Sequence, residues 1–151
     1  LNLGMNYVPG KIQSLINLPN QVQAIPMICF ESIFHYKSIN KNICETDLVI
    51  QVSNDSWFGK WYGPQQHLAN SLMRSVEFQK TLIRSTPSGV SAVIQPNGII
   101  SHRIDNNVRD YFYYTYYPSN QNMNCLSTMY YVIGLLLLIL FSSWIYVRVK
   151  R

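Results

Sequence analysis

The chain alternates between apolar runs and polar stretches in a pattern that predicts several strands and one amphipathic helix. The apolar runs at 24–30 and 47–53 are bounded by polar residues, as buried strands are, and the second is rich in β-branched side chains. Leu68, Leu72 and Val76 recur at helical spacing with charged residues between them, which predicts a helix packed on a sheet. Residues before the first run are polar and irregular, so we expect a loop there.

Shorter segments follow the expected helix. Strands are predicted at 82–86 and 90–94. A Pro-Asn-Gly turn at 96–98 then directs the chain back along 99–102, as in a hairpin. The aromatic run at 111–117 is interpreted as a final edge strand, with a position at a membrane interface as the alternative. Strands and helices in alternation predict a layered α/β fold.

An uncharged segment extends from Cys125 to Val147. As a helix it would span a hydrocarbon core of roughly 30 Å, so we predict a transmembrane helix there. The basic residues that follow place the C-terminus in the cytoplasm by the positive-inside rule, and the α/β part on the opposite side. The expected domains are a partial α/β domain at 1–124, a transmembrane helix at 125–147 and a basic cytoplasmic tail at 148–151.

The charge of the chain argues against a nucleic-acid partner. The formal net charge is +5, but three of the twelve Lys and Arg residues lie in the C-terminal tail. The other nine basic residues are nearly balanced by seven acidic ones, which leaves little charge for binding phosphates. Cys29, Cys44 and Cys125 lack metal-ligand spacing, so no disulfide framework, metal or cofactor is expected.

Cys29 is the candidate nucleophile because it lies where the first strand is expected to turn into a helix at 31–36. Such a turn projects a side chain out of the sheet, and the N–H groups of the helix favour a thiolate. The alternative is an ordinary buried cysteine that packs as a small hydrophobe. Asn54 and Asp55 follow the next strand, so two polar strand ends are expected at one edge of the sheet.

An aromatic loop comes next, and it either covers an edge of the core or forms the wall of an apolar substrate pocket. Its aromatic residues include Trp57, Phe58 and Trp61. His67, at the start of the helix, is expected to pack or to contact a headgroup. Arg84 is expected to form a structural ion pair, with Glu77 as a candidate partner, and anion binding is the alternative.

Several motifs occur in an order and at spacings that resemble a known family. They are Ile28-Cys29-Phe30-Glu31, Asn54-Asp55-Ser56-Trp57-Phe58-Gly59, Gly63-Pro64-Gln65-Gln66-His67, Met73-Arg74-Ser75-Val76-Glu77, Leu82-Ile83-Arg84-Ser85-Thr86 and Ala92-Val93-Ile94-Gln95-Pro96-Asn97-Gly98. Over residues 25–147 the chain resembles the C-terminal part of the apolipoprotein N-acyltransferases, membrane-embedded members of the nitrilase (carbon-nitrogen hydrolase) superfamily.

The resemblance implies an α-β-β-α sandwich on the periplasmic side of the bacterial inner membrane, with a Glu-Lys-Cys triad. It implies that Cys29 takes an acyl chain from a phospholipid as a thioester and passes it to the N-terminal amine of a diacylglyceryl lipoprotein. Glu31 matches a supporting carboxylate that this family needs beside the cysteine. Substrate contacts are expected from Phe30, Asn54, Asp55, Trp57, Phe58, Trp61 and His67. Asn54 and Asp55 are expected to orient the Cys29 loop rather than to transfer protons.

The chain departs from the family pattern upstream of Cys29. Lys11 is the only charged residue within 1–27, so the Glu and Lys of the triad have no counterpart there. We therefore expect a fragment that is inactive alone. Phe30 stands where a tyrosine is usual, and Pro26 lies within a predicted strand, which suggests a divergent sequence. The alternatives are a membrane-anchored amidase of the same superfamily and a non-functional truncated product.

Overall fold

The computed structural model of the protein describes residues 15–34, 43, 46–59, 61–118 and 127–149, with side chains in the last range at 131 and 133–144. The chain divides into two compact units, Leu1–Asn120 and Gln121–Arg151.

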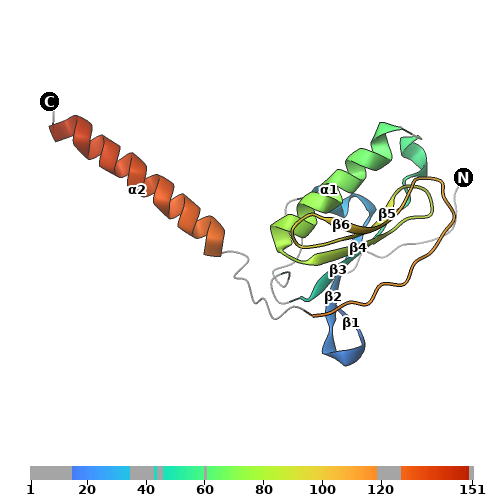
Figure 1. Ribbon diagram of the computed structural model, residues 1–151. Helices are drawn as coiled ribbons and strands as arrows, with labels where there is room; N and C mark the ends of the chain where they lie inside the picture. Colours follow the sequence, from blue (N-terminus) through green and yellow to red (C-terminus); the bar gives the residue numbers. More distant parts are fainter. Residues whose placement is uncertain (1–14, 35–42, 44–45, 60, 119–126, 150–151) are drawn as a thin grey trace, which may run out of the picture. The chain divides into compact units, whose positions relative to one another are not determined.

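A six-stranded mixed sheet is the centre of the first unit (Figure 1). Its strands, in spatial order, are β1 (Ile16–Asn17), β2 (Gln23–Ile28), β3 (Leu48–Val52), β4 (Thr81–Ser85), β5 (Ser91–Ile94) and β6 (Ile100–Ile104). β2, β3 and β4 are parallel, whereas β1, β5 and β6 pair antiparallel with their neighbours. The register aligns Ile28, Val52 and Ser85, so the C-terminal ends of three parallel strands meet at one edge.

The helix α1 (Tyr62–Phe78) covers one face of this sheet (Figure 1). Its Leu68 and Phe78 are buried, as is Leu82 on β4. Burying a side chain of this size contributes about 1.5–3 kcal/mol, so the buried apolar face of α1 is a main source of stability. Pro64 lies in the first turn of α1, where a missing N–H breaks no helical hydrogen bond.

The aromatic segment 111–117 packs on the opposite face of the sheet. It is irregular rather than a strand, so the predicted edge strand is wrong. Its side chains still alternate, with even-numbered residues half-buried and odd-numbered residues exposed. Tyr116 packs against Ala24 and Leu48, and its hydroxyl donates to the Asp47 carbonyl at 3.0 Å. Side-chain contacts therefore hold this segment on the sheet, where a strand would be held by backbone hydrogen bonds.

The other predicted elements of the first unit are largely confirmed. The strands expected at 24–30, 47–53, 82–86, 90–94 and 99–102 are β2 to β6. The helix expected from 31 is wrong, because the chain forms a 3-10 helix, η2 (Cys29–Ile33), and is extended again at Phe34. Residues 35 and 36 lie outside the described residues. β1 was not predicted, since it lies in the region expected to be a loop.

Pro26 lies in a part of β2 that tolerates a proline. β1 pairs only with Gln23 and Ala24, so beyond Ala24 the described chain has no strand on that side of β2. Proline is accommodated in such outer stretches because the ladder does not need its missing N–H. Pro26 is therefore compatible with a regular sheet.

The second unit contains the helix α2 (Ser127–Val149), which overlaps the segment predicted to cross a membrane. Among the residues that the structure describes, no helix has both the length and the apolar character needed to cross a bilayer. The predicted transmembrane helix is thus not confirmed. Cys125, where the predicted span begins, lies outside the described residues.

Candidate active site

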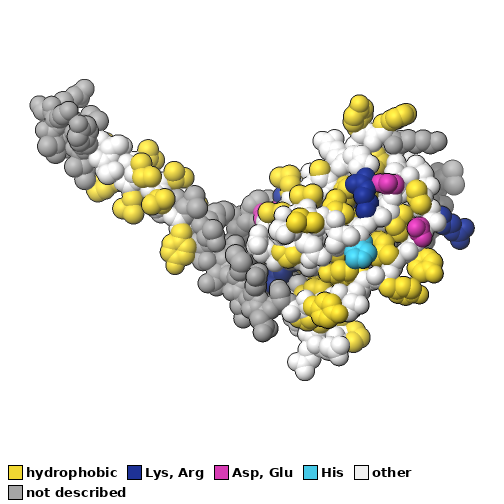
Figure 2. All heavy atoms as spheres, viewed as in Figure 1, with side chains coloured by type: hydrophobic (Ala, Val, Ile, Leu, Met, Phe, Trp, Pro, Cys, Tyr) yellow, Lys and Arg dark blue, Asp and Glu magenta, His cyan; other side chains and the backbone are white. Residues whose placement is uncertain are grey.

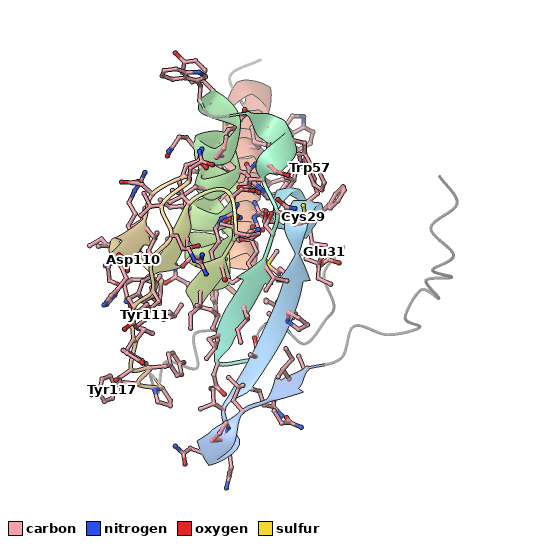
Figure 3. All side chains as sticks on the ribbon, turned by 90° about the vertical axis from the view of Figure 1, so that its right-hand side faces the viewer. Cys29, Glu31, Trp57, Asp110, Tyr111 and Tyr117 are labelled. Atoms are coloured by element: carbon pink, nitrogen blue, oxygen red, sulfur yellow. The ribbon has the colours of Figure 1, made fainter. Side chains whose placement is uncertain are left out.

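Cys29 lies at the end of β2, where the strand turns into η2. Its φ of 52° is left-handed, a conformation that costs a non-glycine residue roughly 1–2 kcal/mol. Glu31 closes the turn, because its Oε2 accepts a hydrogen bond of 2.7 Å from the Ile28 N–H. Figure 3 shows Cys29 and Glu31 together at this end of β2. The Cys29 side chain is half-buried and not in a disulfide, so its thiol lies at the rim of the sheet.

Interior side chains hold the backbone carbonyl of Cys29. Gln51 Nε2 donates to this oxygen at 3.2 Å, and His67 Nε2 lies 3.1 Å from it. Ser32 Oγ lies 3.4 Å from the same oxygen and 3.2 Å from His67 Nε2. All three side chains are buried. The strained turn is therefore fixed by the protein interior.

His67 belongs to a buried series of polar groups that ends at Arg84. His67 Nδ1 lies 2.8 Å from Asp55 Oδ1, and Arg84 Nη2 donates to Asp55 Oδ2 at 2.6 Å. Ser53 Oγ donates another hydrogen bond, of 2.7 Å, to Asp55 Oδ1. Each of the two carboxylate oxygens thus has a partner, as a buried carboxylate requires.

Arg84 also begins a second series of contacts. Its Nη1 donates to Ser71 Oγ at 3.0 Å, and Ser71 Oγ donates to Gln51 Oε1 at 2.6 Å. Gln51 then donates to the Cys29 carbonyl, so both series start at one guanidinium and end at one oxygen. Arg84 Nη2 also lies 3.2 Å from His67 Nδ1, and Arg84 Nε donates to the Val90 carbonyl at 3.1 Å, which fixes the guanidinium to the loop before β5.

The surroundings of Asp55 are both charged and crowded. Burial lowers the pKa of Arg84, while the negative charges of Asp55 and of a Cys29 thiolate oppose this shift. A guanidinium nevertheless stays charged in proteins, so Asp55 faces a permanent cation. A Cβ at Gly89 would lie 2.5 Å from Asp55 Oδ2, and Gly89 has a φ of 144°. Only glycine fits both the space and the backbone conformation.

Apolar side chains of the Cys29 turn and of the aromatic loop before α1 are exposed at the surface. Ile28 and Phe30, on either side of Cys29, are 62% and 44% exposed. Trp57, in the 3-10 helix η5 (Ser56–Phe58), and Trp61 are 66% and 81% exposed. Figure 2 shows hydrophobic side chains projecting at the top of the view, where α1 begins in Figure 1. Exposed apolar surface of this kind is typical of a site that contacts lipid, ligand or protein.

A cleft of about 340 Å³ opens beside the turn, between η2 and the first half of α1. It is lined by Phe30, Ile33, Phe58, Gly63, Gln66, His67 and Asn70. The Phe30 ring lies 5.5 Å from the Phe58 ring and stacks on His67 at 5.6 Å, measured between centroids. The cleft therefore has an apolar wall next to the cysteine and a polar edge on α1.

The predicted substrate-contact residues occupy two environments. Asp55 and His67 are buried and bonded to each other, close to the Cys29 backbone, so contact with a substrate stays a prediction for both. Asn54 is exposed, and its Oδ1 accepts a hydrogen bond of 2.9 Å from Ser88 Oγ. The aromatic residues of the loop lie at the surface or line the cleft. No group of three or more His, Cys, Asp or Glu residues in the described part of the chain could hold a metal ion.

The structural ion pair expected for Arg84 is confirmed, but the expected partner is wrong. Glu77 pairs with Arg74 at 2.6 Å, whereas Arg84 pairs with Asp55. Asp55 precedes Arg84 by 29 residues, so no helical or strand spacing connects them. The available signal was a charged residue within an expected buried strand, because such a charge needs a partner.

The sequence matches the family model of the carbon-nitrogen hydrolases over residues 13–116, which is most of the chain. The chain belongs to the carbon-nitrogen hydrolase family. This carbon-nitrogen hydrolase is similar to proteins named apolipoprotein N-acyltransferase. The one from Wigglesworthia glossinidia brevipalpis is 41% identical over 88 residues, and the one from Bdellovibrio bacteriovorus is 44% identical over 73 residues. The matches cover 58% and 47% of this chain but 17% and 13% of those relatives, so it spans less than a fifth of their length.

Solved structures of the nitrilase superfamily share the fold of this carbon-nitrogen hydrolase. Nit3 from Saccharomyces cerevisiae has a TM-score of 0.54 at 19% identity, over 66% of this chain and 39% of its own. A mutant of the amidase from Nesterenkonia sp. AN1 has a TM-score of 0.51 at 20% identity, over 66% of this chain and 40% of its own. In that structure the acetamide moiety of fluoroacetamide is added covalently at the active site cysteine. At these identities the likeness shows the fold alone.

Proposed function

We propose that this chain is the cysteine-bearing part of an apolipoprotein N-acyltransferase, and that Cys29 carries the acyl chain. The observation that supports this most directly is a half-buried thiol on a strained turn with exposed Ile28, Phe30 and Trp57 around it. A lipid acyl donor needs such an apolar approach to the nucleophile. The relatives named apolipoprotein N-acyltransferase support the same activity.

The proposed reaction has two acyl transfers. The thiolate sulfur of Cys29 attacks the ester carbonyl carbon of a phospholipid, the carbon–oxygen bond to glycerol breaks, and the alkoxide takes a proton. The α-amine of a diacylglyceryl lipoprotein then attacks the thioester. The carbon–sulfur bond breaks, the amine loses a proton, and an amide and a free thiolate result. Sulfur suits this role because a thioester stays reactive toward an amine.

Other residues of the site have supporting roles in this proposal. Glu31 holds the nucleophile turn through its hydrogen bond to the Ile28 N–H. Phe30 and Phe58 line the cleft beside the turn and contact the acyl chain. Trp57 and Trp61 contact lipid at the surface, and Asn54 orients the loop at 86–90 through Ser88.

The proton acceptor and the lysine implied by the resemblance have no counterpart in residues 1–27. We therefore propose that this chain turns over only together with groups from elsewhere, and that by itself it has no acyltransferase activity. The proposed setting is the bacterial inner membrane, with the α/β domain on the periplasmic side and residues 125–147 as the anchor. The absence of charge between Cys125 and Val147 supports this anchor.

Acyl-enzyme trapping tests the proposed function. The product of the complete gene is incubated with a phospholipid, without acceptor, and the peptide that contains Cys29 is examined by mass spectrometry. We expect one added acyl group, which neutral hydroxylamine removes, and none in the Cys29→Ala variant. Acylation elsewhere, or none, would overturn the assignment. In a second incubation with the diacylglyceryl acceptor present, release of free fatty acid without transfer to its amine would instead indicate a hydrolase.

A further inference from the structure

We propose that Arg84, Asp55 and His67 are positioning residues that aim the Cys29 thiol by holding the backbone carbonyl of the same residue. This inference rests on the proposed role of Cys29 as acyl carrier. It assigns a function to a buried network whose groups do not reach the surface cleft, apart from the edge of His67. Three features support this role: the strained backbone of Cys29, the closed hydrogen-bond network and the position of His67 Nε2 beside the Cys29 carbonyl.

The strain at Cys29 means that its conformation has to be held. A left-handed backbone costs a cysteine free energy, and relaxation to an ordinary φ would rotate the Cα–Cβ bond and move the sulfur. The Cys29 carbonyl belongs to the same residue, so donors fixed on that oxygen also fix the direction of the side chain. Gln51 and His67 supply donors from different elements, β3 and α1.

The network is closed, so neither donor can move alone. Arg84 holds Asp55 and thereby His67 on one side, and holds Ser71 and thereby Gln51 on the other. Both sides end at the Cys29 carbonyl. Because Arg84 is itself fixed on β4, the turn after β2 is tied to the third strand of the parallel set.

His67 contributes through a specific atom. Its Nδ1 lies 2.8 Å from Asp55 Oδ1 and 3.2 Å from Arg84 Nη2, and its Nε2 lies 3.1 Å from the Cys29 carbonyl oxygen and 3.2 Å from Ser32 Oγ. A hydrogen on Nε2 lets His67 donate to the Cys29 carbonyl oxygen, which can only accept. A glutamine amide can place an N–H where Nε2 lies, whereas an asparagine amide can place one only where Nδ1 lies. The two substitutions separate the contact to Cys29 from the contact to Asp55.

The test compares His67→Gln and His67→Asn in the product of the complete gene. We expect His67→Asn to lower kcat by about 100-fold with little change in KM, because a small misplacement of a reacting group has that effect. The rate of Cys29 alkylation by iodoacetamide should fall in parallel. His67→Gln should restore most of both rates. His102→Asn, on β6 and packed against Phe112, is the matched control and should change neither.

Two further measurements distinguish a positioning role of His67 from a loss of stability and from a failure of the proposed function. Thermal unfolding of both His67 variants should show similar losses of stability, so that stability alone cannot explain a difference in rate. Equal rates for the two variants, or an increase in KM with unchanged kcat, would overturn the positioning role. If Cys29→Ala retains acyl transfer, the proposed function fails, while the alkylation rates still decide whether His67 positions the thiol.

Discussion

At the level of single residues, the site combines an unfavourable backbone with a buried ion pair. Cys29 is left-handed without being glycine, and Arg84 and Asp55 are both withdrawn from water. Neither feature favours folding by itself, because strain and desolvation each cost free energy. Both costs have a purpose in the proposal if they preserve the geometry of the Cys29 turn.

The ion pair gives a prediction about stability. Arg84→Met should lower the free energy of unfolding by about 3–5 kcal/mol, because the Asp55 carboxylate would remain buried without its cation. The double variant Arg84→Met with Asp55→Asn should lose clearly less than the sum of the two single variants. Urea unfolding of the four proteins gives the coupling energy. Strict additivity would show that the two side chains do not depend on each other.

At the level of elements, side-chain chemistry replaces backbone pairing in the segment 111–117. Its aromatic residues alternate as a strand would, but Tyr116 is bound through its hydroxyl to Asp47 and through its ring to the sheet. Burial raises the pKa of Tyr116 above its ordinary value of 10.0, and the negative charges of Asp47 and of Tyr114 add to this shift. The phenol is therefore kept neutral in the folded state.

This shift gives a prediction about pH. The unfolded chain loses the Tyr116 proton near the ordinary value, whereas the folded chain retains it at higher pH. The contribution of Tyr116 to stability is thus complete below pH 10.0 and is lost as pH rises through the higher folded value. Tyr116→Phe should flatten the loss of stability in alkaline solution, measured by urea unfolding across a pH series. An unchanged slope would contradict the role of this hydroxyl.

At the level of the whole molecule, the two compact units have different tasks in the proposal. The unit Leu1–Asn120 contains the sheet and Cys29, and the unit Gln121–Arg151 contains α2. An acyl carrier that accepts chains from a phospholipid works best close to a bilayer. We therefore expect the second unit to keep the first at the membrane.

Membrane extraction tests this expectation. In membranes from cells that make this chain, alkaline carbonate should leave the complete chain in the pellet, because a helix inserted in hydrocarbon is not released by high pH. A chain ending at Asn120 should move to the supernatant. Release of both forms would refute anchoring by residues 125–147.

The sequence by itself determined most of the sheet, the helix α1 and the position of Cys29 at a strand end. These features follow from the local periodicity of apolar residues, which does not depend on distant parts of the chain. The same local signals failed where distant groups decide the outcome. They predicted a helix after Cys29 and a strand at 111–117, and they gave Arg84 the partner Glu77.

Only the tertiary structure decided how Cys29, the proposed nucleophile, is supported. Gln51 and Ser71 lie inside regular elements and give no sequence signal, yet they connect Arg84 to the Cys29 carbonyl. His67 reaches that carbonyl across 38 residues of sequence. Buried polar groups must find partners wherever the fold brings them together, and that meeting is set by strand register and helix packing rather than by spacing along the chain.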